Sequence, residues 1–195
     1  MRLDSDARQN LLENGQRLIA GKGFSAVGLN EILTAAGVPK GSFYHYFGSK
    51  NAFGEALLES YFKDYLTDLD EALAQPGPMA QRILNYWQHW QETQSYLDYQ
   101  GKCLAVKLGA EVADLSEAMR LALDRGTSAV IDRLEQAVAA GVSEGSLTID
   151  DNPRDVARGL YQLWLGASVM AKIARDAQPF QTAMMTTRHI LHLST

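Results

Sequence analysis

The sequence has one cysteine, five prolines and no long hydrophobic run, and these shortages exclude several classes of protein. A single cysteine cannot form an internal disulfide, so a disulfide-stapled secreted domain is excluded and a reducing compartment is indicated. No apolar run approaches the roughly 18 residues needed to cross a bilayer, so we expect no membrane partner. The N-terminal residues MRLDSDARQN are polar and lack the apolar core of a signal peptide. We therefore expect a cytoplasmic protein.

Positive charge is scarce as well, and it is unevenly distributed. The chain carries a net charge of −5. Residues 1–50 hold six Lys and Arg against four acidic residues, a charge of +2, whereas the remainder holds twelve against nineteen, a charge of −7. Because an acidic protein with a less acidic end can bind nucleic acid by that end, DNA binding by the first fifty residues is compatible with the charge.

Strand-like alternation is absent, and helical periodicity runs through most of the chain. The spacing predicts helices over 5–20, 29–36, about eight residues opened by Pro39, 50–73, 79–94, 101–113, 116–141, 153–175 and 180–192. Asn152, just before Pro153, is a predicted helix N-cap. The prediction is an all-α fold, with a three-helix head at residues 1–48 joined to a helical body at residues 49–195.

The most specific pattern lies in the head. A helix, the tight turn AAGVPKG and a short second helix form the skeleton of a helix-turn-helix. On the helical wheel of KGSFYHYF, at about 100° per residue, Phe43 and Phe47 share one face and His45 points away from them. The outward face also holds Gly41, flanked by Ser42 and Tyr44.

This outward face suits the major groove of DNA. An imidazole can donate to a base, hydroxyls can bind bases or phosphates, and a glycine lets the backbone come close. The candidate DNA-contacting residues are Lys40, Gly41, Ser42, Tyr44, His45 and Lys50. The alternative is that these aromatic residues are only the core and rim of a helical bundle, but that leaves the outward run Tyr44-His45-Tyr46 unexplained.

The stretch GFSAVGLNEILTAAGVPKGSFYHYFGSKNAF resembles the DNA-binding head of the TetR family of transcriptional repressors. The resemblance implies an all-helical homodimer that binds operator DNA, with a divergent body that binds an inducer and joins the subunits through its last two long helices. The six candidate residues fall on the family's DNA-contacting positions. Many members carry Thr or Ser at the start of the second helix, where this chain has Gly28. Gly28 can cap that helix, and its backbone N–H can replace the hydroxyl at a phosphate.

Cys103 is a candidate sensor. It follows Gly101, where we expect a helix to begin, with Lys102 beside it and Lys107 one helical turn further on. A helix N-terminus and nearby cations favour the thiolate, which reacts with electrophiles and oxidants. The alternative is a buried, inert cysteine that fills a gap in the core.

A narrower resemblance bears on this choice. The segments GKCLAVKLGAEVADLSEAMR and LYQLWLGASVMAKIARD are similar to the electrophile-responsive (N-ethylmaleimide repressor-like) branch of the TetR family. In that branch a cysteine at the position of Cys103 is the sensor, and a lysine at the position of Lys172 takes part when the thiol is oxidised. The resemblance implies a repressor that an electrophile or oxidant releases from its operator, with Lys107 added to the sensor residues by its spacing from Cys103.

Aromatic residues in the body suggest a competing mechanism. Seven rings lie in two stretches, at Tyr86, Trp87, Trp90, Tyr96, Tyr99, Tyr161 and Trp164. Cavities lined by such rings between helices are common ligand sites, so a small-molecule inducer pocket is predicted at Trp87, Trp90, Tyr161 and Trp164. The alternative is ordinary core packing. His89 and His189 show no spacing typical of a metal site, and we expect no cofactor.

The last two predicted helices are apolar on more than one face, which usually indicates a partner. The candidate dimer contacts are Leu160, Leu163, Val169, Met184, Met185 and Ile190. Two helices from each subunit would form a two-fold interface and present two heads to a palindromic operator.

Two other classes of protein remain as alternatives. A thiol-dependent enzyme needs a base beside its cysteine, usually a histidine, and none is near Cys103 in sequence. We therefore expect no enzymatic activity. An interaction module that kept the fold of the head but lost DNA binding is supported only by the acidic net charge.

Overall fold

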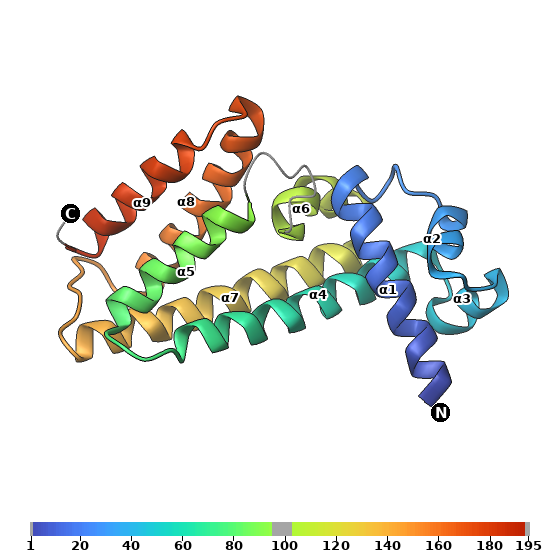
Figure 1. Cartoon of the computed structure of the whole chain (residues 1–195), viewed down its shortest axis with the longest axis horizontal. Coiled ribbons are helices and arrows are strands. Elements are labelled where there is room, and N and C mark those ends of the chain that lie inside the picture. The colour runs from blue at the N-terminus through green and yellow to red at the C-terminus, as the bar shows by residue number, and fades with distance from the viewer. Residues whose placement is uncertain (1, 95–102, 194–195) are drawn as a thin grey trace. The chain divides into compact units, whose positions relative to one another are not determined.

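The computed structural model describes residues 2–94 and 103–193 and is shown in Figure 1. Within those ranges the chain forms nine helices and no strand, which confirms the predicted all-α fold. The helices are α1 Arg2–Lys22, α2 Leu29–Ala36, α3 Lys40–Phe47, α4 Lys50–Leu73, α5 Met79–Thr93, α6 Leu104–Leu115, α7 Glu117–Ser143, α8 Pro153–Ala174 and α9 Gln178–Ile190. No helix in this part of the chain combines the length and hydropathy that a membrane span requires.

The helix boundaries agree with the predicted ranges to within a few residues. Helices α2 and α4 match at both ends. Helix α6 begins at Leu104, and Gly101, where a helix start was predicted, lies outside the described residues. Local periodicity and turn residues were therefore sufficient to locate these elements.

The chain divides into two compact units. The first takes in the described residues of Met1–Lys63 and Tyr99–Gly126, and the second those of Asp64–Asp98 and Thr127–Thr195. Helices α4 and α7 each contribute residues to both units. The functional boundary after residue 48 stays a prediction, since compactness alone does not say where DNA binding ends.

In the first unit, α1 lies beside α2 and α3 (Figure 1). Gly37 ends α2 in the left-handed conformation, with φ of 64°, and so allows the chain to reverse toward α3. The Asn10 side-chain amide on α1 donates to the carbonyl of Ala36 at 2.7 Å and thereby satisfies one of the last carbonyls of α2. The tight turn of the predicted helix-turn-helix is therefore held from α1.

The core of this unit contains a cluster of phenylalanine rings. Phe43, Phe47 and Phe53 lie with ring centroids between 5.0 and 5.4 Å apart. Gly15 lets α1 approach α4 closely, because a Cβ at that residue would stand 2.4 Å from the Phe53 ring. The two inward residues of α3 are thus fixed against α4 by aromatic packing.

The second unit has a tryptophan-rich core between α5, α8 and α9. The rings of Trp87 and Trp164 stack at 4.9 Å with an interplanar angle of 8°. The indole N–H of Trp90 donates to Ser168 Oγ, and that of Trp164 donates to Thr187 Oγ1, both at 2.9 Å. These buried hydrogen bonds link α5 to α8 and α8 to α9.

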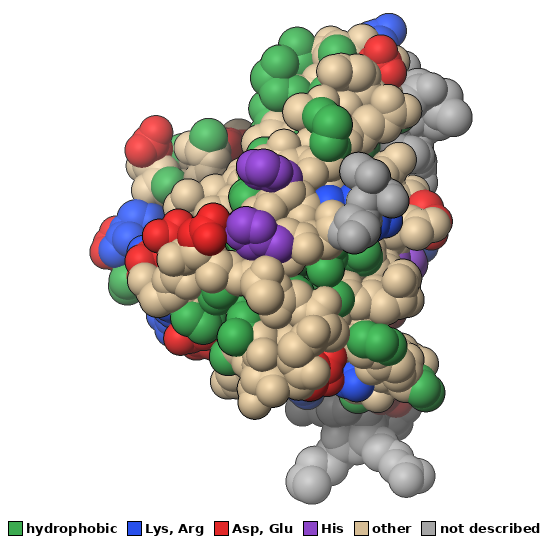
Figure 2. Space-filling view, turned by 90° about the vertical axis from the view of Figure 1, so that its left-hand side faces the viewer, with side chains coloured by type: hydrophobic (Ala, Val, Ile, Leu, Met, Phe, Trp, Pro, Cys, Tyr) green, Lys and Arg blue, Asp and Glu red, His purple; other side chains and the backbone are tan. Residues whose placement is uncertain are grey.

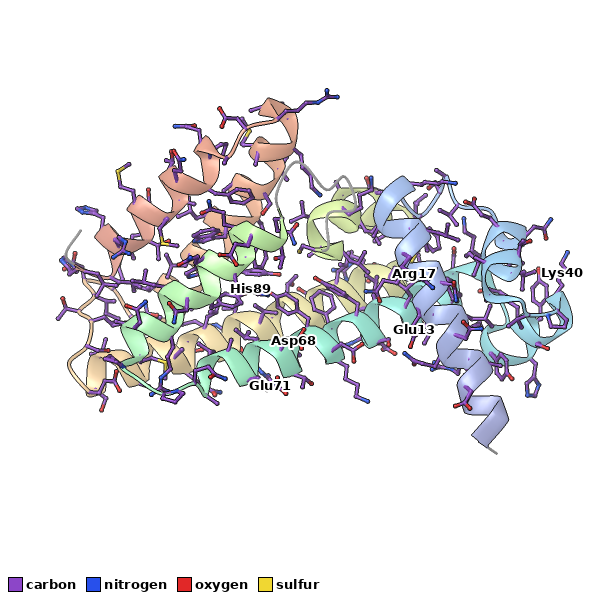
Figure 3. All side chains as sticks on the ribbon, viewed as in Figure 1. Glu13, Arg17, Lys40, Asp68, Glu71 and His89 are labelled. Atoms are coloured by element: carbon purple, nitrogen blue, oxygen red, sulfur yellow. The ribbon has the colours of Figure 1, made fainter. Side chains whose placement is uncertain are left out.

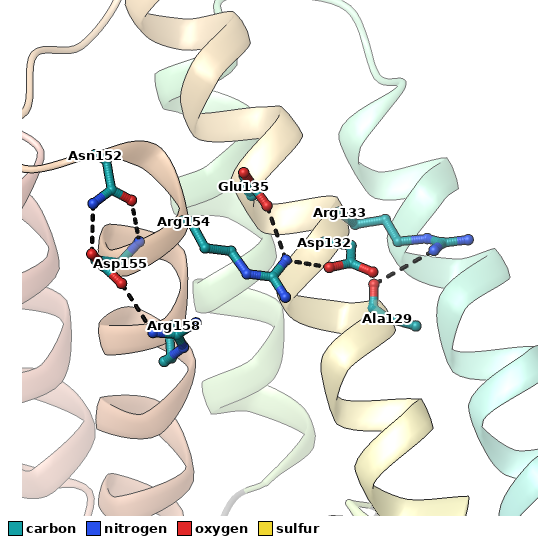
Figure 4. Close-up of polar contacts among 8 residues, drawn as sticks. All are labelled: Ala129, Asp132, Arg133, Glu135, Asn152, Arg154, Asp155 and Arg158. Carbon is teal, nitrogen blue, oxygen red and sulfur yellow. Dashed lines mark hydrogen bonds and ion pairs between the residues drawn. The ribbon is translucent and has the colours of Figure 1, made fainter.

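Polar contacts in the same unit join α7 to α8 (Figure 4). The Asn152 side chain accepts a hydrogen bond from the backbone N–H of Asp155 at 3.0 Å, which confirms the predicted N-cap of α8. The Arg154 guanidinium donates to Asp132 and to Glu135, both on α7. The start of α8 is therefore fixed by its own cap and by α7.

Candidate nucleic-acid interface and cysteine site

Helix α3 is divided between a buried face and an exposed face, as its sequence predicts. Phe43 and Phe47 are buried, whereas Tyr44 is 48 % exposed and His45 is also exposed. Lys40 and Gly41 are exposed at the start of the helix, and Ser42 is half-buried. The predicted orientation is confirmed for Phe43, Phe47, Tyr44 and His45, whereas Tyr46, the last residue of the predicted outward run, is half-buried. Contact of this face with DNA stays a prediction.

The two glycines of the candidate interface are not required by the fold. A Cβ on Gly28 or on Gly41 would meet no atom within 4 Å, and neither residue has a positive φ. Gly28 is the N-cap of α2, in an extended conformation with no side-chain cap. An exposed glycine that folding does not require is consistent with close approach of a partner to the backbone.

The two lysines that flank α3 differ in their surroundings. Lys40 extends outward from α3 (Figure 3) and is exposed. The Lys50 ammonium donates to the carbonyl of Phe24 at 2.8 Å and stands 4.6 Å from the centroid of the Phe24 ring. Burial lowers the pKa of Lys50, and the charge of Glu111 opposes that shift. Lys50 thus uses one of its donors inside the protein, a contact that sequence reasoning missed.

Arg8 is a further cation beside α3 that sequence reasoning did not single out. Its guanidinium carbon stands 5.2 Å from the centroid of the Phe47 ring, and the side chain is exposed. Nothing in the local sequence marks this residue, because Phe47 reaches it only through the packing of α3 on α1.

Cys103 is the N-cap of α6 and is only 2 % exposed. The Lys107 ammonium donates to the carbonyl of Gly21 at 3.1 Å, so its charge is directed at the end of α1. Lys102 lies outside the described residues. Lys172 is half-buried on α8, in the other compact unit, and its proximity to Cys103 stays a prediction.

The residues of the predicted ligand pocket pack against one another. Trp87, Trp90, Tyr161 and Trp164 are all buried, and the Trp90 ring lies edge-on to Tyr161 at 6.1 Å. The indole N–H of Trp87 is buried and has no hydrogen-bond partner among the described residues. Tyr96 and Tyr99 lie outside the described residues. In the parts of the chain that the structure covers, no group of three His, Cys, Asp or Glu side chains is arranged to hold a metal ion.

The predicted dimer contacts differ in burial, and only two of them, Val169 and Met185, are exposed. Leu160 is buried in the core of its own unit, so we leave it out of the proposed interface, and Leu163, Met184 and Ile190 are half-buried. Four large apolar side chains of α8 and α9 are between 42 % and 70 % exposed, namely Val169, Met170, Ile173 and Met185. Figure 2 shows the side of the molecule on which α9 ends, where hydrophobic side chains reach the surface between polar ones.

The chain matches two family models and several known proteins. The model described as "Bacterial regulatory proteins, tetR family" matches residues 11–57, and the one described as "Tetracyclin repressor-like, C-terminal domain" matches residues 77–187. The HTH-type transcriptional repressor NemR of Escherichia coli (strain K12) is 44 % identical over 96 % of this chain and 95 % of its own length. The HTH-type transcriptional repressor DhaR of Mycobacterium sp. (strain GP1) is 34 % identical over 88 % of this chain and 85 % of its own length.

A solved structure agrees with these matches. The crystal structure of the reduced form of E. coli NemR superposes with a TM-score of 0.91 at 45 % identity, covering 95 % of this chain and 97 % of that one. One assignment follows from these similarities, from the helix-turn-helix of α2 and α3 and from the tryptophan-rich second unit. The chain is a helix-turn-helix transcriptional regulator of the TetR family.

Proposed function

We propose that the chain is a transcriptional repressor that binds operator DNA through α3 and leaves it when an electrophile modifies Cys103. The observation that carries the DNA-binding part is the exposed face of α3, where an imidazole, a phenol and an ammonium surround a glycine that folding does not require. Phosphate contacts from Lys40 would position the head, and His45 would read a base. Such a regulator acts in the cytoplasm, where the operator is accessible.

The proposal includes a homodimer: two copies of the chain bind one operator together. The exposed residues Val169, Met170, Ile173 and Met185 supply an apolar surface on two helices, which is the kind of surface that a two-fold interface covers. Two heads related by a two-fold axis suit a palindromic operator. Light scattering at micromolar concentration should give the mass of a dimer, and a monomer would contradict this part of the proposal.

The proposed sensing step is addition of the Cys103 thiolate to an activated double bond. With N-ethylmaleimide, the sulfur bonds to one alkene carbon, the π bond breaks, and the neighbouring carbon takes a proton from water. No group leaves and no oxidant is needed. The solved structure of the relative, E. coli NemR, is of its reduced form.

Burial of Cys103 explains how a small adduct could act at a distance. The Cys103 side chain is almost completely buried, at the N-cap that precedes α6. Protein interiors hold few voids larger than a water molecule, so a maleimide ring has no room beside a residue that is 2 % exposed. The adduct must therefore displace the start of α6 or the side chains around it.

The test is operator binding by wild type and Cys103→Ser, each with and without N-ethylmaleimide. Because the chain has one cysteine, mass spectrometry should show a single adduct on wild type and none on the serine variant. We expect labelled wild type to leave the operator and treated Cys103→Ser to stay bound. Equal release of both proteins would refute the thiol mechanism. Turnover of the maleimide, in place of one stoichiometric adduct, would instead indicate an enzyme, which we do not propose.

A second candidate is a non-covalent inducer held in the second unit, and the buried Trp87 N–H, for which the described residues supply no acceptor, favours it. A ligand with a hydrogen-bond acceptor would satisfy this buried donor. The close stacking of Trp87 on Trp164 opposes it, because a ligand would have to separate the two rings. Release of Cys103→Ser from the operator by a small molecule that quenches tryptophan fluorescence would support this candidate.

A further inference from the structure

The turn between α1 and α2 is held by three side chains from outside the turn. The Glu111 carboxylate on α6 accepts hydrogen bonds from the backbone N–H groups of Phe24, at 3.1 Å, and Ser25, at 2.7 Å. From the same helix, Lys107 donates to the carbonyl of Gly21 at 3.1 Å. Lys50, the first residue of α4, donates to the carbonyl of Phe24. We call Glu111, Lys107 and Lys50 the turn clamp.

The shape of the turn is fitted to Glu111. Gly23 has a φ of 93°, which an L side chain rarely adopts, and a Cβ there would stand 2.9 Å from Glu111 Oε2. A glycine is therefore required at this position both for the backbone conformation and for the approach of the carboxylate. Burial would raise the pKa of Glu111, but the hydrogen bonds from Ser25 and Phe24 and the charge of Lys107 lower it below its ordinary value. The group that holds the turn is thus an ion, whose hydrogen bonds are stronger than those of a neutral acceptor.

The turn clamp connects the candidate sensor to the helix-turn-helix within one compact unit. Cys103, Lys107 and Glu111 are spaced by four residues, so they follow one side of α6 from its N-cap. The opposite end of the connection is Ser25, three residues before Gly28, the N-cap of α2. Helix α2 in turn packs against α3. A displacement of α6 at Cys103 therefore acts on the start of α2 through polar contacts that hold backbone atoms.

We propose that Glu111, assisted by Lys107, is the positioning residue that makes the operator affinity of the head depend on the chemical state of Cys103. This inference rests on the proposed function, because it supposes that modification of Cys103 releases the operator. Glu111 lies eight residues along the chain from Cys103 and is not one of the proposed DNA contacts.

The chain offers a matched control for the turn clamp. The Lys22 ammonium at the end of α1 pairs with Glu31 in the first turn of α2, across the same turn. This pair lies wholly within the head and does not involve α6. Glu111→Gln and Glu31→Gln are therefore the same chemical change on the two sides of one turn, and only the first removes a link to α6.

The experiment measures the dissociation constant for an operator duplex, selected from random DNA, before and after complete labelling of Cys103 with N-ethylmaleimide. Wild type and Glu31→Gln should each lose affinity by about tenfold or more, a usual size for coupling between two sites. Glu111→Gln should have nearly the same affinity labelled and unlabelled. Amide hydrogen exchange of residues 21–28 should accelerate on labelling of wild type, and it should already be fast in unlabelled Glu111→Gln.

Lys107→Met provides a second variant in case Glu111→Gln folds poorly, because it removes only one half-exposed donor from the turn. It should reduce the effect of labelling without abolishing it. A wild-type response to labelling in both Glu111→Gln and Lys107→Met would overturn the inference and leave the proposed function intact. Labelled wild type that stays on the operator would overturn the proposed function itself, so the two failures are distinguishable.

Discussion

Gly41→Ala should stabilise the fold of this protein and weaken its binding to operator DNA. Gly41 is the second residue of α3, is exposed, and has open space around its missing Cβ. Because its φ is not positive, alanine fits the helix without strain. Replacing a helical glycine by alanine gains roughly 0.5–1 kcal/mol. For a chain of this length the gain corresponds to a rise in Tm of about 1–4 °C.

The same methyl group would stand on the face that we place against the DNA. If it holds α3 away from the groove, the loss is comparable to one good base contact, roughly 1–3 kcal/mol for each head. Two heads on one operator double this to roughly 2–6 kcal/mol, which raises Kd by about 30-fold to about 10⁴-fold. The opposite signs of the two effects distinguish a DNA-facing glycine from a merely structural one.

Fluorescence anisotropy with one operator duplex, together with thermal unfolding followed by circular dichroism, measures both effects of Gly41→Ala. Gly21→Ala is the matched control, because Gly21 is also exposed, helical and surrounded by open space, but lies in α1. It should raise Tm by a similar amount and leave Kd unchanged. A Gly41→Ala variant with raised Tm and unaltered Kd would show that this face of α3 does not approach the DNA.

Three further predictions concern single side chains. Lys40→Ala should lower specific and non-specific affinity for DNA together. The plot of log K, the logarithm of the DNA-binding constant, against log salt concentration should become less steep by about the amount expected for one lost phosphate contact; an unchanged slope would remove Lys40 from the interface. Gly28→Thr should raise Tm slightly, because the hydroxyl can cap α2 and gain about a few tenths of a kcal/mol, but it should weaken operator binding, because we place the backbone of Gly28 close to a phosphate; tighter binding would show that the backbone of Gly28 does not approach the DNA. The difference in Tm between wild type and Glu111→Gln should be full at neutral pH and should shrink as the pH falls below 4.5, the ordinary pKa of a glutamate, because the pKa of Glu111 is lowered in the fold and its carboxylate stabilises the folded chain only while it is ionised. The charged groups that face Glu111 are Lys107 and Lys50. A difference in Tm that does not depend on pH would contradict the turn clamp.

Much of the fold could be predicted from local patterns. The stripe on α2, the glycine at its end and the proline before α3 fix where those helices begin and end. The inward face of Phe43 and Phe47 and the cap by Asn152 follow from periodicity and from side-chain chemistry within a few residues. Such features depend on neighbours in sequence, so a single sequence contains them.

The contacts that the sequence did not predict connect residues far apart in the chain. Glu111 reaches Ser25 across 86 positions, and Lys107 reaches Gly21 across the same separation. The sequence predicts Lys50 only as a DNA-contacting residue, because its partner within the protein, the carbonyl of Phe24, is brought to it by the packing of the turn on α4. Leu160 was assigned to the dimer surface for a similar reason, since periodicity does not tell which apolar face of α8 its own unit covers.

Selection of DNA sequences shows whether the exposed face of α3 reads the operator. Wild type and His45→Ala would each be used to enrich duplexes from a random library, and the bound sequences compared. We predict a palindrome for wild type and, for His45→Ala, loss of preference at one position in each half-site with a cost of roughly 1–3 kcal/mol for each contact. The same palindrome with the same preferences for both proteins would contradict the claim that the imidazole of His45 reads the operator.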